Sequence, residues 1–189
     1  MLKYLTSILA VLLLALPVSS VWADQYDDTI SIFKNAGASG TFFKNAYGYA
    51  VFPTIGKGGF VLGGAYGKGR VYQRGKYVGD TSLIQVTAGY QLGGQAYSQI
   101  IFFEDQRAFN EFTGGNFEFG AEAGAVAITA GASAAASTTG SSAGASGTNK
   151  IATTVGGYYK GMATFTVAKG GLMYAATLGG QKFSYKPHR

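Results

Sequence analysis

Short runs of aromatic and β-branched residues, each bounded by glycine, occupy most of the sequence after Gly48. Runs of this length and composition are typical of β-strands joined by tight turns. In 83–92, apolar residues from Ile84 to Leu92 alternate with glutamine and threonine, which predicts one dry face and one wet face. We therefore predict a mainly β domain of the α+β class, with an antiparallel or barrel-like sheet. The expected strands are 49–52, 59–66, 70–73, 83–92, 95–103, 116–129, 151–159, 161–168, 171–178 and 182–185.

Short helices are predicted before the first strand. Acidic and hydroxyl side chains at 27–29 are suited to cap a helix that presents Ile30 and Phe33 on one face and ends at Gly37. A second helical turn is expected at 39–46.

One internal segment also breaks the strand period and predicts an amphipathic helix. It opens at Glu104 and closes at Gly114, and Ala108, Phe109 and Phe112 form its apolar stripe.

The first 23 residues have the pattern of a secretory signal peptide. Lys3 supplies a positive start, 8–16 is an apolar run, and Val21 and Ala23 are small residues at the spacing that signal peptidase reads. The alternative is an uncleaved anchor, but a membrane span needs about 20 apolar residues and this run has nine. We therefore predict export to the periplasm, with 24–189 as one domain.

Cleavage is expected after Ala23, because the required pair of small residues occurs there alone after the apolar run. Mass spectrometry of the exported protein should then find Asp24 as the first residue. A mature product that still contains Leu9 to Leu16 would contradict this prediction and restore the anchor.

Within the predicted domain, residues 131–149 contain only glycine, alanine, serine, threonine and asparagine. A segment without large side chains cannot build a core. It is predicted to be a flexible loop that interrupts the strands without dividing the domain.

The composition excludes most catalytic chemistry. There is no cysteine, and the single histidine, His188, is next to the last residue. Thiolate metal sites and cysteine nucleophiles are therefore excluded. A histidine base could come only from His188, whose position near the terminus makes it a poor one. Glu118 and Glu122 share a strand face, but no other catalytic group accompanies them. We expect no enzyme activity, no metal site and no cofactor.

The charge pattern provides the best functional candidate. Five basic residues and no acid occur within 57–76. If 68–72 continues as a strand, Lys68, Arg70 and Tyr72 point to one face, and the following Arg-Gly-Lys forms a hairpin tip. Basic groups near an anionic leaflet contribute about 1 kcal/mol each. A solvated hairpin whose charges discourage edge pairing is the alternative.

Five motifs follow one another along 45–185. They are Gly48-Tyr49-Ala50-Val51-Phe52-Pro53 with Lys57 and Gly59-Phe60, then Gly89-Tyr90-Gln91-Leu92-Gly93-Gly94-Gln95, the helix with Phe109 and Phe112, the strand 119–123, and Lys169-Gly170-Gly171-Leu172 through Gly180. In this order they resemble the SYLF domain, a lipid-binding module of yeast actin-patch proteins and of many secreted bacterial proteins. The resemblance implies a mainly β domain with a few helices that binds acidic phospholipids or phosphoinositides.

These observations together predict non-catalytic, peripheral binding of anionic phospholipid in the cell envelope. The alternative is a small outer-membrane β-barrel or a structural envelope protein, although the internal helix and the polar loop count against a barrel. Nucleic-acid binding would suit the pI of about 9.4 but not the export signal. Protein partners are not specified by the sequence. The residues expected to bind lipid are Lys57, Lys68, Arg70, Tyr72, Arg74, Lys76, Lys169 and Lys182.

Overall fold

The computed structural model describes residues 19–56, 64–86, 96–120, 124–128, 157–169, 176–177 and 180–188. The predicted loop at 131–149 lies outside these ranges. The described helices are α2 (Ser19–Asn35), α3 (Gly37–Gly40), α4 (Phe42–Asn45) and α5 (Gln106–Thr113). The described strands are β1 (Gly48–Gly56), β2 (Gly64–Gln73), β3 (Lys76–Val86), β4 (Tyr97–Phe103), β5 (Phe117–Glu118), β6 (Gly124–Ile128), β7 (Met162–Ala168), β8 (Ala176–Thr177) and β9 (Gln181–Pro187).

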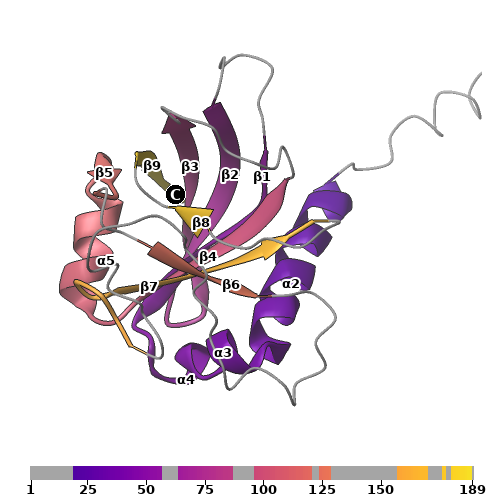
Figure 1. The fold of residues 1–189 in the computed structure, drawn as a ribbon, viewed down its shortest axis with the longest axis horizontal. Helices are drawn as coiled ribbons and strands as arrows, with labels where there is room; N and C mark the ends of the chain where they lie inside the picture. Colours follow the sequence, from indigo (N-terminus) through magenta and orange to yellow (C-terminus); the bar gives the residue numbers. More distant parts are fainter. Residues whose placement is uncertain are drawn as a thin grey trace, which may run out of the picture.

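These strands form one curled sheet in the order β5-β9-β3-β2-β1-β4-β7-β6-β8. Neighbouring strands are antiparallel, except for β6 and β7, which run parallel. Figure 1 shows α5 on one side of the curled sheet and α2, α3 and α4 on the other. The predicted mainly β, α+β fold with a barrel-like antiparallel sheet is therefore confirmed, with one parallel pair in addition.

Each face of the sheet has its own hydrophobic core. On the α5 face, Phe103, Phe112 and Phe183 are buried, with ring centroids 4.9 Å apart for Phe103 and Phe112 and 5.1 Å for Phe112 and Phe183. On the α2 face, Phe42 packs its ring 5.4 Å from that of Phe102. Aromatic side chains bury large areas, so these two layers hold the short helices against the sheet.

The β2–β3 hairpin has the predicted tip but is longer than predicted. Arg74 and Gly75 connect the strands with φ values of 49° and 78°, the left-handed pair that a type I′ turn requires. Strand β2 runs without interruption through the gap between the predicted strands 59–66 and 70–73, and β3 begins at Lys76 rather than at residue 83.

Glycines inside β2 account for the error in strand length. A Cβ atom on Gly69 would lie 2.6 Å from Cδ1 of Phe52, and one on Gly67 would lie 2.6 Å from Cγ1 of Ile55. Both glycines are therefore needed for close packing against β1 and do not mark turns.

The structure reverses the predicted dry and wet faces of β3. Leu83 is fully buried and Gln85 is 1% exposed, whereas Ile84, which the alternation places on the dry face, is 44% exposed. The register pairs Leu83 with Gly67, whose missing side chain leaves room for leucine on the α5 face. Neighbouring strands thus decided which face of β3 is buried.

The N-terminal helix begins earlier than predicted. It starts at Ser19, so residues 27–29 lie inside α2, where the Thr29 hydroxyl donates a 2.7 Å hydrogen bond to the Gln25 carbonyl. The predicted capping role of 27–29 is therefore wrong, because the preceding turn is helical. Ile30 and Phe33 are buried as predicted. In the described ranges, no helix combines the length and the hydropathy needed to cross a bilayer.

The predicted internal helix is confirmed as α5. The Asp105 carboxylate accepts a 2.8 Å hydrogen bond from the Ala108 amide, which is an N-cap. Ala108, Phe109 and Phe112 are buried as predicted, and the helix ends at Gly114. Its apolar stripe covers the interior of the curled sheet.

Candidate functional site

Part of the α2 face of the sheet carries exposed side chains. The register of β2, β3 and β9 places Tyr66 opposite Ile84 and Ile84 opposite Lys182. Tyr66 is 39% exposed and Ile84 is 44% exposed. In the part of the chain that the structure describes, the other exposed large hydrophobic side chain is Ile32 on α2. Two of these three side chains are therefore neighbours on adjacent strands.

Three lysines lie around this hydrophobic pair. Lys68 follows Tyr66 by two residues on β2 and so shares its face. It pairs in register with Thr54 on β1, whose hydroxyl accepts a 2.7 Å hydrogen bond from Nζ of Lys169. Lys182 on β9 completes the group, about 10 Å from β2 at the usual strand spacing. We call these exposed residues the lysine face: Tyr66, Lys68, Ile84, Lys169 and Lys182.

The lysine face has little opposing charge. Its one ion pair in the described ranges joins Nζ of Lys182 to Glu118 at 3.4 Å, and both side chains are about half exposed or more. Exposed pairs of this kind contribute at most about 1 kcal/mol and exchange readily for another partner. Between the lysines, the hydroxyls of Ser82 and Ser184 lie 2.7 Å apart. The face is therefore cationic at its edges and uncharged at its centre.

Arg70 has a structural role instead. Its guanidinium carbon lies 4.3 Å from the ring centroid of Tyr26 on α2 and 5.0 Å from that of Tyr77 on β3. Asp80 is its partner in register and accepts a 2.8 Å hydrogen bond from the Tyr77 hydroxyl. Burial raises the pKa of Tyr26, and the nearby guanidinium opposes that rise. Arg70 thus links α2 to the hairpin, and its guanidinium interacts with the rings of Tyr26 and Tyr77.

Tyr72 is a core residue, which corrects its predicted position at the surface. It is 9% exposed, and its ring stacks on that of Tyr49 with centroids 4.9 Å apart. Burial raises the pKa of Tyr72, and the hydrogen bond and charge of Arg70 oppose that rise. Strand alternation identifies which residues share a face, but it does not show where along the strand a helix covers that face.

The remaining predicted residues lie elsewhere. Arg74 and Lys76 are exposed at the hairpin tip, at the opposite end of β2 from Tyr66, and Arg74 lies over the Tyr47 ring at 5.3 Å. Lys57 lies outside the described residues. The basic stretch of the sequence is therefore divided in space, and Lys68 is the member that joins Lys169 and Lys182.

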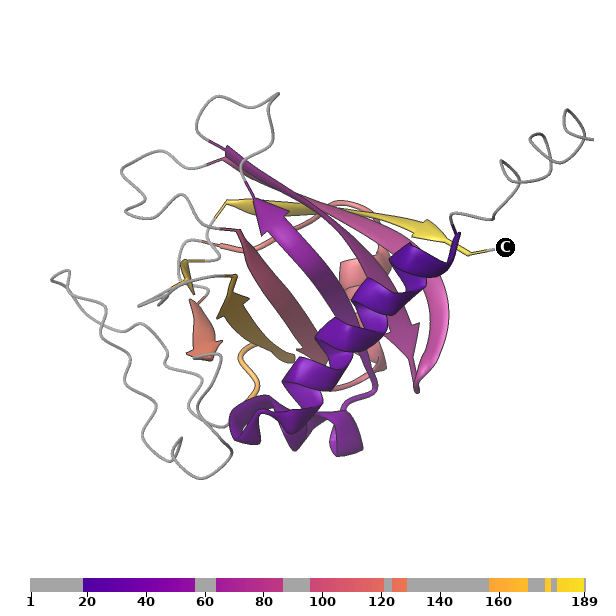
Figure 2. The ribbon, with the colours of Figure 1, turned by 90° about the vertical axis from the view of Figure 1, so that its right-hand side faces the viewer.

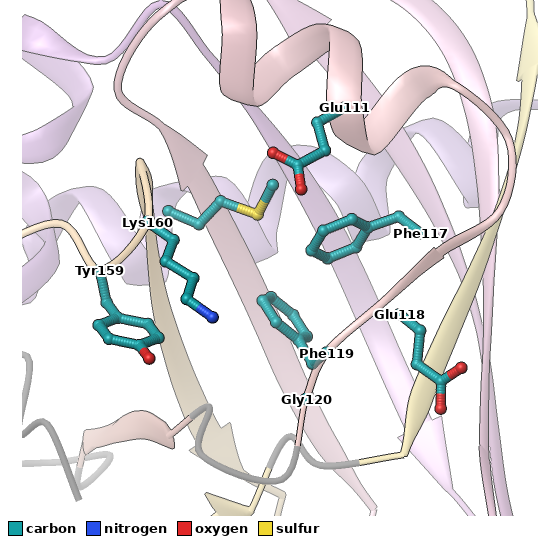
Figure 3. Close-up of a pocket in the computed structure, with 8 residues that line it drawn as sticks. Glu111, Phe117, Glu118, Phe119, Gly120, Tyr159 and Lys160 are labelled. Atoms are coloured by element: carbon teal, nitrogen blue, oxygen red, sulfur yellow. The ribbon is translucent and has the colours of Figure 1, made fainter.

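A small cavity bounded by α5, β5 and the turn at 159–160 is a second candidate site (Figure 3). Its volume is about 120 Å³. The Glu111 carboxylate at its rim accepts a 3.2 Å hydrogen bond from Arg107, and Glu118 is paired with Lys182. Among the described residues, no group of three or more acidic or histidine side chains could hold a metal ion. The lining residues are Glu111, Phe117, Glu118, Phe119, Gly120, Tyr159, Lys160 and Met162.

The curled sheet encloses a buried polar cluster that was not predicted from the sequence. Gln85, Gln99 and Gln181 are each at most 1% exposed. Gln99 and Gln181 exchange two side-chain hydrogen bonds, at 3.0 and 3.2 Å, and the Tyr97 hydroxyl donates to Gln85 at 3.1 Å. Burial raises the pKa of Tyr97 to about 12. The position of Gln99 directly before the apolar run 100–103 of β4 is the signal that could have revealed this cluster.

Comparison with known proteins identifies two similarities. A family model described as Ysc84, Las17-binding protein actin regulator, matches residues 84–186, which is more than half of the chain. Beta cell expansion factor A from Aeromonas veronii is 29% identical over 158 residues, which cover 82% of this chain and 51% of that protein. The chain thus spans about half the length of this curated relative.

Proposed function

Since this chain belongs to the Ysc84, or SYLF, domain family, we propose that it is an exported protein that binds the surface of anionic phospholipid membranes peripherally and without catalysis. The family is one of binding domains. The resemblance of the motifs along 45–185 to SYLF modules implies acidic lipids as ligands. Within this proposal the protein acts in the periplasm.

The observation that supports this proposal is the lysine face. Lys68, Lys169 and Lys182 come from three separate parts of the sequence and lie on one exposed surface. At about 1 kcal/mol for each basic residue near an anionic leaflet, three lysines provide weak, reversible attraction. The exposed tyrosine and isoleucine between them lower the cost of contact with the interfacial region.

A protein ligand is the competing function. The matching family model is described as binding the protein Las17, so its members include a protein-binding example. The lysine face would also suit an acidic protein surface, because lysine attracts any anionic partner. Lipid vesicles distinguish the two, since they contain no protein.

Vesicle co-sedimentation tests the proposed function. The processed protein is expected to bind vesicles that contain phosphatidylglycerol and not vesicles of phosphatidylcholine alone. Binding should weaken as salt rises from about 50 to 200 mM, because the Debye length falls to below about 8 Å. Equal binding to both kinds of vesicle, or no binding to either at low salt, would contradict the proposal.

A further inference from the structure

We propose that Tyr66 and Ile84 insert into the interface of an anionic bilayer, so that the parts of β2, β3 and β9 that carry the lysine face meet the membrane while the lysines contact headgroups. This inference rests on the proposed function and specifies the surface and the orientation of binding.

The outward position of Ile84 is the first observation. β3 has Gln85 buried and Ile84 44% exposed, the reverse of what water alone would favour for this pair. The interior polar cluster explains why Gln85 is buried. It does not explain why an isoleucine occupies the exposed position next to it, because an exposed isoleucine does not stabilise the fold in water. Contact with the apolar part of a bilayer would remove the Ile84 side chain from water and so favour binding.

The second observation is the pairing of Ile84 with Tyr66. Single exposed hydrophobic residues are common, but directly opposed residues on antiparallel strands form a continuous surface. Tyrosine is suited to the interface because its ring is apolar and its hydroxyl can remain hydrated. The pair can therefore enter the headgroup region without burying an unpaired polar group.

The third observation is the charge around the pair. Lys182 lies opposite Ile84 in register, and Lys68 is two residues from Tyr66 on the same strand. Lysine stems can lie along an apolar surface while their ammonium groups remain at the headgroups. This arrangement favours an anionic bilayer over an uncharged apolar protein surface as the occupant.

The orientation also agrees with the placement of α2. Figure 2 shows α2 crossing the sheet diagonally. Tyr26 of α2 contacts Arg70, which follows Lys68 by two residues on β2, and Lys68 itself is exposed. Tyr66, Lys68 and Ile84 are exposed with α2 in place, so contact through these residues requires no movement of the helix.

Tryptophan fluorescence gives a direct test. The single tryptophan, Trp22, belongs to the segment that processing is expected to remove, so Tyr66→Trp gives the mature protein one tryptophan, which can be excited selectively over the tyrosines. On anionic vesicles we expect a blue shift and quenching by lipids brominated on their acyl chains. The control is Ile32→Trp, at the exposed hydrophobic position on α2, which should show neither.

Loss-of-contact variants provide the second measurement. Tyr66→Thr combined with Ile84→Thr keeps strand-favouring side chains and is expected to reduce partitioning about a hundredfold, mainly in the fraction that resists salt. Ile32→Thr is the matched control and should bind like the wild type. Circular dichroism checks that each variant is folded.

The outcomes separate this inference from the proposed function. If wild-type protein binds no anionic vesicles, the proposed function fails and this inference fails with it. If wild type binds but the tryptophan at position 66 stays unshifted and the double threonine variant binds normally, only the inserted pair is wrong. A blue shift that requires protein concentration and no lipid would assign the pair to contact between two copies and overturn the inference.

Discussion

Reversing two charges of the lysine face, with Lys68→Glu and Lys169→Glu, is expected to weaken partitioning onto anionic vesicles by about a thousandfold. Each substitution removes one attraction and adds one repulsion near the leaflet, so the pair changes the binding free energy by about 4 kcal/mol. Both side chains are exposed, and Lys169 donates a hydrogen bond to Thr54 at the surface. Co-sedimentation at low salt measures the loss.

The hairpin tip offers a control with the same change in net charge. Arg74→Glu with Lys76→Glu alters two basic residues of the same sequence stretch at the far end of β2. We expect this variant to bind within about tenfold of wild type, because its charges lie outside the contact surface. If the tip variant loses more binding than the face variant, the site is at the tip. Arg70 is unsuitable for either variant, since its charge also holds α2 through Tyr26.

Replacing Gln181 by methionine is expected to lower the free energy of unfolding by about 3 kcal/mol. The substitution keeps the approximate volume but removes both hydrogen bonds that Gln181 exchanges with the Gln99 amide. Gln99 is fully buried, so water cannot easily replace the lost partner. An unsatisfied buried polar group costs about 1–3 kcal/mol, and here both the amide donor and the carbonyl acceptor are affected.

Thermal unfolding measures this effect. A loss of about 3 kcal/mol corresponds to a decrease in Tm of roughly 10 °C for a chain of this size. Lys182→Met is the matched control, because it makes the same new side chain at the next position of β9 on the exposed face. Its Tm should change by no more than about 2 °C. Equal decreases for the two variants would show that the polar cluster does not stabilise the fold.

The local elements could be predicted because their signals lie within a few residues. Asp105 is followed by apolar residues at helical spacing, which are sufficient to define α5 and its buried face. The Arg74-Gly75 turn was also predictable, since glycine is favoured where φ is positive. The length of β2 was not predictable from Gly67 and Gly69, because the same residue type that permits a turn also permits close packing between strands.

The candidate site was predicted only in part, for a related reason. Lys68 and Lys182 were expected to bind lipid, which stays a prediction, and the structure places them on one face of the sheet. Tyr72 was expected there too, but it is buried because helices pack over its end of the strand. The residues next to Tyr72 in the sequence do not indicate that packing. Tyr66 and Ile84 were not predicted, because the apolar residues of a strand are assigned to the core by default.

By itself, the sequence determined that this protein is a mainly β domain with helices before the sheet, one internal amphipathic helix and a basic hairpin. Those features follow from residue type and near-neighbour spacing. Only the tertiary structure decided that β3 turns Gln85 inward and Ile84 outward, and that Lys169 lies beside Lys68. The reason is physical: which face of a strand is buried depends on partners in other strands, and those partners are brought together by folding.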